Sequence, residues 1–185
     1  IDSTNDYAKK IAGEGAEAGT VVISGRQTAG RGRMGRTFIS PAGSGLYMSV
    51  ILRPGSEFAD AVPLTSAAAV AVCRVIRRMT GADAGIKWVN DIYVNDRKLA
   101  GILAESVLSD SGEIKYYICG IGINIFKRIF PQRFDVWWFW SACCRNNLFC
   151  CFKNITIFFL ERNRGFQRNS FNLYSCISTS RGNCF

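Results

Sequence analysis

The sequence changes character after Ile125, and this break limits the fold that can be predicted from it. Of its 185 residues, those after Ile125 hold eleven of 13 Phe, three of four Trp and six of eight Cys, but only two of 18 Gly. The net charge of +9 is divided unevenly: residues 1–125 carry 14 Lys+Arg and 12 Asp+Glu, whereas residues 126–185 carry nine and two. We therefore treat residues 1–125 as one domain and residues 126–185 as an unassigned tail.

Residues 1–125 alternate short apolar runs with turn residues around one long helical segment. Pro63 to Met79 has a proline near its start, an alanine-rich body and arginines near its end, which favours a helix aligned with its macrodipole. A shorter helix is expected from the polar residues 2–5, which can cap it, through Ile11. Apolar and β-branched runs predict strands at residues 20–24, 46–52, 86–94, 99–108 and 114–119. This mixture predicts an α+β fold whose mixed, largely antiparallel sheet is covered by helices on one face.

Three arginines alternate with glycines at residues 30–36, GRGRMGR, which we call the Gly/Arg segment. Glycine permits positive φ and a close approach of main-chain N–H groups to a ligand. Arginine adds a permanent charge and a planar fork of donors that suits phosphate and carboxylate. A flexible solvated loop is the alternative interpretation. The composition favours a loop that closes over a small anionic ligand.

Residues 87–91, KWVND, place a cation, an amide and a carboxylate at the end of a predicted strand. A turn near Asn90 and Asp91 would bring both polar side chains to that strand end. Magnesium prefers oxygen ligands and commonly bridges phosphates, so a magnesium-bound nucleotide could lie there. Taken alone, the pair Asn90–Asp91 is also compatible with an ordinary turn.

Lys98 follows Asn95–Asp96, a turn pair of hairpin type, and precedes an apolar strand that contains Gly101. A glycine inside a strand often marks a position where a ligand approaches the backbone. A lysine at such a position can neutralise a carboxylate or an α-phosphate while the two react. A solvated lysine in a hairpin is the alternative.

Taken together, these segments resemble one family, the biotin–protein ligases, which join biotin to a lysine of biotin-dependent carboxylases. Any one segment would be a weak signal, but five occur in the family's order across about residues 1–125. They are Ser3-Thr4-Asn5, QTAGRGRMGR at residues 27–36, KWVND at residues 87–91, RKLAGIL at residues 97–103 with Glu105, and GIGIN at residues 120–124. The resemblance implies a catalytic domain like that of class II aminoacyl-tRNA synthetases, incomplete here at its N- and C-terminal ends.

The resemblance also implies an ATP-dependent reaction in two steps. The biotin carboxylate attacks the α-phosphate of MgATP and gives biotinyl-5′-AMP and pyrophosphate. A lysine of a biotin carboxyl carrier domain then attacks this mixed anhydride and releases AMP. Two anions meet in the first step, so fixed cations would lower its barrier. The implied cofactors are ATP and Mg²⁺, and the implied partners are biotin, ATP and the carrier domain of a carboxylase.

Site residues follow from the same resemblance, motif by motif. The expected catalytic residues are Arg33, Lys98, Lys87 and Asp91. The expected biotin contacts are Ser3, Thr4, Asn5, Gln27, Gly30, Arg31, Arg33, Lys98, Gly101, Gly120 and Gly122. The expected ATP or adenylate contacts are Arg31, Arg33, Arg36, Phe38, Lys87, Asn90 and Asn124, and the expected magnesium ligands are Asn90 and Asp91. The Gly/Arg segment would then be a lid that keeps water from the adenylate.

The sequence departs from the family's pattern at three places. Val89 stands where the family usually has proline and lacks its rigid turn constraint. Phe38 occupies a position that is often tryptophan, so it keeps an aromatic ring without the indole N–H. After Asn124 the family continues with a helix and usually a small β-barrel domain, and nothing after Ile125 resembles either. We interpret residues 126–185 as an out-of-frame translation or a similarly altered sequence, a hypothesis that re-reading the encoding DNA in the other two frames would test.

Other chemistry finds little support in the sequence. The cysteine pairs of the tail lack C-x₂-C spacing, and the chain has no histidine, which excludes histidine-based triads and histidine-ligated metals. The basic and aromatic tail leaves nucleic-acid binding as an alternative there, but no nucleic-acid partner is expected for residues 1–125. A strand is predicted at residues 155–160.

No apolar run approaches the ~20 residues that span a bilayer, so no membrane partner is expected. Only Cys73 and Cys119 fall in residues 1–125, far apart and in apolar surroundings, which favours reduced thiols and a cytoplasmic location. Two alternatives to an active biotin ligase remain: a lipoate or octanoate acyl ligase, and a truncated or frame-altered non-enzymatic fragment that binds biotin weakly. A homodimer is left open.

Overall fold

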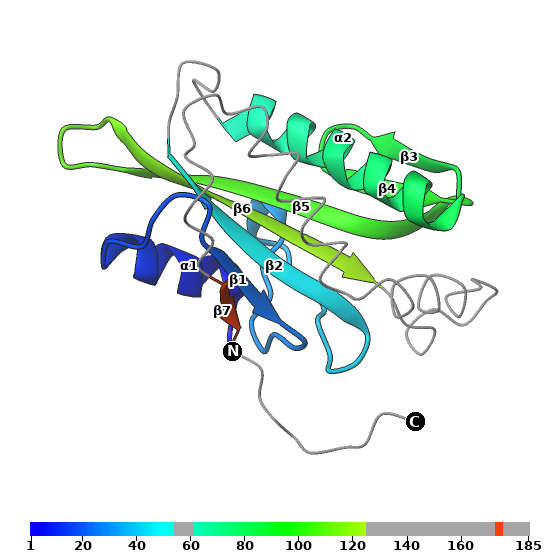
Figure 1. The fold of residues 1–185 in the computed structure, drawn as a ribbon, viewed down its shortest axis with the longest axis horizontal. Coiled ribbons are helices and arrows are strands. Elements are labelled where there is room, and N and C mark those ends of the chain that lie inside the picture. Colours follow the sequence, from blue (N-terminus) through cyan, green and yellow to red (C-terminus); the bar gives the residue numbers. More distant parts are fainter. Residues whose placement is uncertain (54–60, 125–172, 176–185) are drawn as a thin grey trace.

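A seven-stranded sheet organises the part of the chain that the computed structural model describes, which is residues 1–53, 61–124 and 173–175 (Figure 1). The strand order is β3-β4-β5-β6-β2-β1-β7. Neighbouring strands are antiparallel except β1 and β7, which are parallel. The strands are β1 Val21–Ser24, β2 Gly45–Leu52, β3 Ala84–Lys87, β4 Asp91–Val94, β5 Arg97–Leu108, β6 Ile114–Asn124 and β7 Leu173–Ser175. The expectation of a mixed, largely antiparallel sheet in an α+β fold is confirmed.

Two helices pack against this sheet, α1 at Thr4–Gly13 and α2 at Ala61–Thr80. Helix α1 begins where the Ser3 hydroxyl accepts a hydrogen bond from the Asp6 N–H at 3.3 Å, which caps a free N–H group of the first turn. Helix α2 buries Leu64, Ala68, Ala71, Val72 and Ile76, which recur at the helical period on one face. The alanines among them let the helix lie close to β5 and β3.

The two helices lie on opposite faces of the sheet, so the expectation that helices cover one face is wrong. Alternate side chains of a strand point to opposite faces. Along β2, Met48 and Val50 belong to the core cluster that contains the buried face of α2, whereas Ile51 belongs to the cluster that contains Ala8 and Ala12 of α1. The twenty-residue α2 covers one face, and the shorter α1 leaves part of the other face uncovered.

Most predicted elements form, but the strand expected at residues 86–94 is two strands. Residues 88–90 form a turn between β3 and β4, which pair with each other in antiparallel register. The predicted hairpin turn is confirmed, since Asn95 and Asp96 have φ values of 48° and 59° between β4 and β5. The strand predicted at residues 155–160 lies outside the described residues, and β7 was not predicted.

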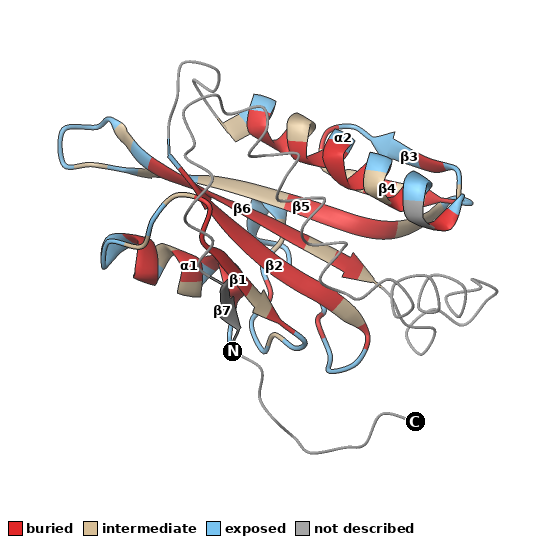
Figure 2. Ribbon diagram, viewed as in Figure 1, coloured by how far each residue is buried: buried red, intermediate tan, exposed pale blue. Residues whose placement is uncertain are grey.

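Burial is concentrated in the central strands β2, β5 and β6, as Figure 2 shows. The turn that joins β5 to β6 projects beyond this core and is exposed (Figure 2). Cys73 and Cys119 are buried and unbridged. Among the described helices, none is both long and apolar enough to cross a membrane.

Candidate ligand pocket

The Gly/Arg segment is a closed hairpin rather than an open flexible loop. Phe38 N donates to Gly30 O at 2.9 Å, and Gly32 N donates to Arg36 O at 2.7 Å. A short 3₁₀ turn at Arg33–Gly35 forms its tip, where Met34 has a φ of 55°. The main-chain ladder therefore holds the arginine-bearing tip as one unit, and glycines occupy the positions where the two arms approach closely.

The hairpin stands over a pocket of about 240 Å³ on the same sheet face as α1, over the part of that face that α1 leaves uncovered. The pocket collects residues that are far apart in the sequence, from the start of the chain, the Gly/Arg segment, β4, β5 and β6. Of the predicted site residues it is lined by Ser3, Thr4, Asn5, Gln27, Arg31, Arg33, Arg36, Phe38, Asn90, Asp91, Lys98, Gly101, Gly120 and Gly122.

Strand register explains why glycines form the floor of the pocket. In one row across four strands, Asp91 pairs with Gly101, Gly101 with Gly122, and Gly122 with Tyr47. The next row on the same face places Leu103 beside Gly120. Because residues that pair across an antiparallel sheet point to the same face, the three glycines leave a trough between larger side chains, and Asn5 and Phe38 enter it.

The polar end of the pocket is built around Gln27. Its Oε1 accepts hydrogen bonds from Thr4 N at 2.8 Å and from Thr4 Oγ1 at 3.0 Å, and its Nε2 donates to Ser40 Oγ at 2.9 Å. Ser3 and Thr4 are buried, and Ser3 is engaged as the cap of α1. These groups satisfy one another in this structure, and together they make this end of the pocket polar.

Asn5 occupies the trough above Gly120. Its Oδ1 accepts from Ser49 Oγ at 2.6 Å, and its Nδ2 donates to Glu105 Oε2 at 2.7 Å. Asn5 is 4% exposed, and a Cβ added to Gly120 would overlap the Asn5 amide. Gly120 is thus required by the close approach of a buried side chain from α1.

The Phe38 ring fills the neighbouring part of the trough. A Cβ on Gly122 would lie 2.6 Å from Phe38 Cε1, and one on Gly101 would lie 3.1 Å from Phe38 Cε2. The ring also packs edge-on against Tyr47, with centroids 6.2 Å apart. Phe38 therefore forms an apolar wall directly on the two glycines that were expected to line the biotin slot.

The opposite end of the pocket is cationic. Lys98 Nζ lies 2.7 Å from Asp91 Oδ2, and Asp91 Oδ1 accepts from Asn90 Nδ2 at 2.9 Å. Arg33 Nη1 reaches down from the hairpin to donate to Asn90 Oδ1 at 3.1 Å. A Cβ on Gly101 would lie 3.5 Å from Lys98 Nζ, so that glycine also leaves room for the ammonium group. One hydrogen-bonded chain thus connects the hairpin tip to the start of β4 and the start of β5.

Arg31 differs from the other arginines of the hairpin because two carboxylates hold it. Its Nη1 lies 2.6 Å from Asp6 Oδ1, and its Nη2 lies 2.9 Å from Glu105 Oε1. The hydrogen bond to Asp6 raises the pKa of the Arg31 guanidinium. Arg31 lines the pocket with its charge already compensated, whereas the described residues provide no carboxylate partner for Arg33 or Arg36.

Three predicted site residues lie outside the pocket lining: Gly30, Lys87 and Asn124. A Cβ on Gly30 would overlap the carbonyl oxygen of Phe38, so this glycine closes the hairpin. Lys87 is exposed on β3, with its Nζ 5.3 Å from the centroid of the Tyr93 ring. Asn124 ends β6 and pairs with Gly45. The lining residues that the sequence did not suggest are Gly32, Met34, Thr37, Tyr47, Ile102, Leu103 and Ile121.

Asn90 and Asp91, the expected magnesium ligands, are engaged by neighbouring side chains in this structure. Both Asp91 oxygens face donors, Lys98 and Asn90, and Asn90 Oδ1 faces Arg33. Within the described ranges no group of three or more carboxylate, cysteine or histidine residues could hold a metal. Lys98 and Arg33 supply the positive charge at this end of the pocket.

The fold and the pocket together define an α+β domain in which an arginine hairpin covers a glycine-floored trough with one polar and one cationic end. A family model described as the Biotin/lipoate A/B protein ligase family matches residues 1–124. The chain belongs to this family, and the resemblance seen in its five motifs is confirmed.

Individual relatives agree with this assignment. The bifunctional ligase/repressor BirA of Bacillus spizizenii is 43% identical over 125 residues, which cover 68% of this chain and 38% of the relative. The biotin–[acetyl-CoA-carboxylase] ligase of Paracoccus denitrificans is 39% identical over 126 residues, which cover 67% of this chain and 51% of the relative. The chain thus spans less than two thirds of the length of these curated relatives.

A solved structure gives the same result at the level of the fold. The biotin protein ligase from Aquifex aeolicus, in complex with biotin and ATP, aligns with a TM-score of 0.68 and 29% sequence identity. The alignment covers 92% of this chain and 70% of that chain.

Proposed function

We propose that this chain activates biotin with ATP and transfers it to a lysine of a biotin carboxyl carrier domain. The observation that carries the proposal is the juxtaposition of three regions in one pocket: the polar end at Thr4 and Gln27, the apolar wall that Phe38 forms on Gly101 and Gly122, and the cationic end at Lys98. Biotin has the same sequence of properties, with a polar ureido ring, an apolar body and a carboxylate. The relatives of this chain include the bifunctional ligase/repressor BirA of Bacillus spizizenii and the biotin–[acetyl-CoA-carboxylase] ligase of Paracoccus denitrificans.

In the first step, a carboxylate oxygen of biotin attacks the α-phosphorus of ATP, and the bond to pyrophosphate breaks. Lys98 is held by Asp91 at 2.7 Å and would place its ammonium between the two reacting anions. Arg33 and Arg36 would lie over the triphosphate from the hairpin, and Arg33 is held toward the pocket by Asn90. Fixed cations of this kind stabilise charge that grows at the transition state without needing to reorganise.

In the second step, a lysine amine of the carrier domain attacks the acyl carbon of the adenylate. An amide bond forms, the bond between the acyl carbon and the phosphate oxygen breaks, and AMP leaves. The Gly/Arg segment would cover the adenylate until the carrier docks, which limits its hydrolysis by water. Magnesium would enter bound to the nucleotide phosphates, since Asn90 and Asp91 are engaged with their neighbours. A cytoplasmic setting, where ATP and carboxylases meet, completes the proposal and suits the two unbridged thiols Cys73 and Cys119.

A transfer assay with radiolabelled biotin, ATP and a purified carrier domain tests this function. The expected result is ATP-dependent label on the carrier domain that excess lipoate does not reduce. Competition by lipoate would identify a lipoate-type ligase instead. Biotin binding without ATP-dependent transfer would identify a non-enzymatic fragment.

A further inference from the structure

Glu105 lies just beyond the pocket lining, yet it contacts groups that belong to both sides of the pocket. Its Oε1 accepts from Arg31 Nη2 at 2.9 Å and from Lys9 Nζ at 2.8 Å, while its Oε2 accepts from Asn5 Nδ2 at 2.7 Å. Its side chain is 18% exposed. One carboxylate on β5 therefore connects the Gly/Arg segment, helix α1 and the buried amide above Gly120.

The contact with Asn5 fixes which way that amide faces. A carboxylate only accepts hydrogen bonds, so the NH₂ group of Asn5 must face Glu105 and its oxygen must face Ser49, which donates to it at 2.6 Å. Rotation of the amide would place its oxygen against the carboxylate. The Leu103 carbonyl oxygen, 3.4 Å from the same Nδ2, favours the same orientation, so Glu105 and Leu103 together determine which way the amide above Gly120 faces.

The ion pair between Glu105 and Arg31 holds the hairpin in place rather than preparing Arg31 to bind a ligand. Asp6 and Glu105 contribute two negative charges, and Lys9 and Arg31 contribute two positive charges, all joined by ion pairs of 2.6 to 3.9 Å. Because this cluster is compensated, Arg31 is better suited to hold an arm of the hairpin than to bind phosphate. Arg33 and Arg36, at and beyond the tip, remain available for the nucleotide.

We propose that Glu105 is a positioning residue that couples occupancy of the biotin end of the pocket to closure of the Gly/Arg segment. This inference rests on the proposed function, since it requires biotin to contact Asn5. A ligand that locks the Asn5 amide also locks Glu105, and Glu105 then holds Arg31 and the hairpin above the trough. By linkage, a closed hairpin tightens biotin binding by the same factor.

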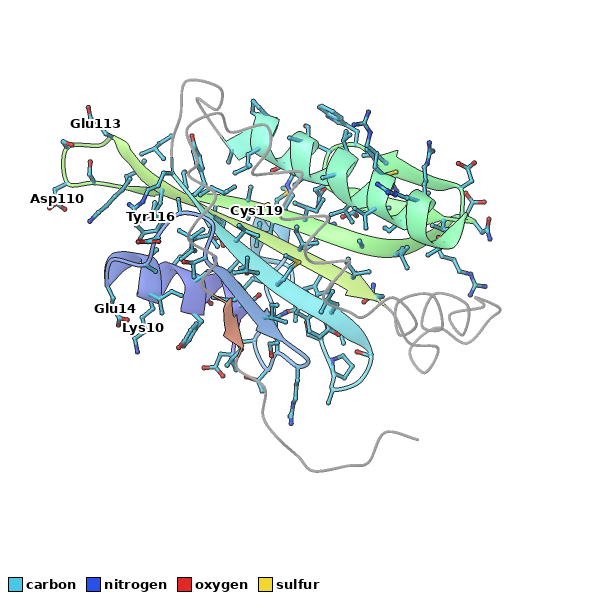
Figure 3. The ribbon with its side chains drawn as sticks, viewed as in Figure 1. Lys10, Glu14, Asp110, Glu113, Tyr116 and Cys119 are labelled. Carbon is cyan, nitrogen blue, oxygen red and sulfur yellow. The ribbon has the colours of Figure 1, made fainter. Side chains whose placement is uncertain are left out.

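Glu105→Gln tests the coupling, with Glu113→Gln as the matched control at the tip of the β5–β6 hairpin (Figure 3). In the full chain, trypsin cleavage after Arg33 and Arg36 is followed by mass spectrometry with and without saturating biotin. Biotin is expected to slow these cleavages in the wild-type chain and in Glu113→Gln, but not in Glu105→Gln. Calorimetry is expected to show about tenfold weaker biotin binding by Glu105→Gln, a factor that corresponds to ~1.4 kcal/mol.

Full protection of the hairpin in Glu105→Gln at saturating biotin would overturn the coupling, whatever its affinity. Thermal unfolding checks that this variant is folded. If it is not, Glu105→Asp replaces it, because a carboxylate one methylene shorter keeps its charge but cannot reach both Asn5 and Arg31. Protection in Glu105→Asp equal to wild type would likewise overturn the coupling. Failure of the wild-type chain to bind biotin would overturn the proposed function together with this inference.

Discussion

Replacing Gly120 with alanine should destabilise the fold and abolish biotin binding together. The added Cβ would overlap Asn5, whose Cγ and Nδ2 would lie only 2.9 and 3.0 Å away. Asn5 would have to leave its site and give up its hydrogen bonds with Ser49, Glu105 and the Leu103 carbonyl. At ~1 kcal/mol for each of these bonds, the free energy of unfolding should fall by about 3 kcal/mol.

The matched control is Gly85→Ala on the exposed strand β3, where an added Cβ meets no atom within 4 Å. Urea and thermal unfolding followed by circular dichroism measure the stability of both variants, and calorimetry measures their affinity for biotin. Gly85→Ala should unfold like the wild-type chain, while Gly120→Ala should melt roughly 10 °C lower. Equal stability of the two variants with biotin affinity intact would refute the role assigned to Asn5.

Three further predictions address the cations and the core. Arg33→Gly should keep adenylate synthesis but release the intermediate, which blotting would detect as biotin on bystander lysines. Arg26→Gly is the control. Tighter retention of the adenylate by Arg33→Gly would contradict the role of Arg33 in covering it. Lys98→Gln should lower the rate of adenylate formation by about 10²- to 10³-fold in a rapid-quench assay, and an unchanged rate would remove Lys98 from the mechanism. Burial raises the pKa of Cys119 to about 12, so iodoacetamide at pH 8 should modify it only in urea. The neutral thiol's contribution to stability should then decline as pH rises from ~8.5 toward that value, and labelling of Cys119 in the folded chain would contradict its burial.

Local sequence signals were sufficient for most of the elements around the site. The helix cap within residues 2–5, the turn pair Asn95–Asp96 and the glycine-interrupted strand β5 each have a physical cause within a few residues, and each forms as predicted. The motifs also located most of the pocket lining, because ligand chemistry demands particular residue types in particular segments.

The sequence could not predict features that depend on long-range contacts or on which face of the sheet an element packs against. The positions of α1 and α2 on opposite faces follow from which side of the sheet each helix packs against, and tertiary packing rather than local sequence decides that. Lys87 was expected in the site, but the turn at residues 88–90 ends its strand and leaves it on the exposed edge. The engagement of Arg31 by Asp6 and Glu105 joins residues 25 and 74 positions apart, and no local pattern signals it.

Biotin-dependent exchange of labelled pyrophosphate into ATP tests the central claim most directly, because it reports adenylate formation in this pocket without any acceptor. The full chain should catalyse this exchange with biotin but not with lipoate, and Lys98→Gln should reduce it about 100-fold or more. Absence of exchange in a folded wild-type chain that binds both biotin and ATP, or exchange supported by lipoate in place of biotin, would contradict the account.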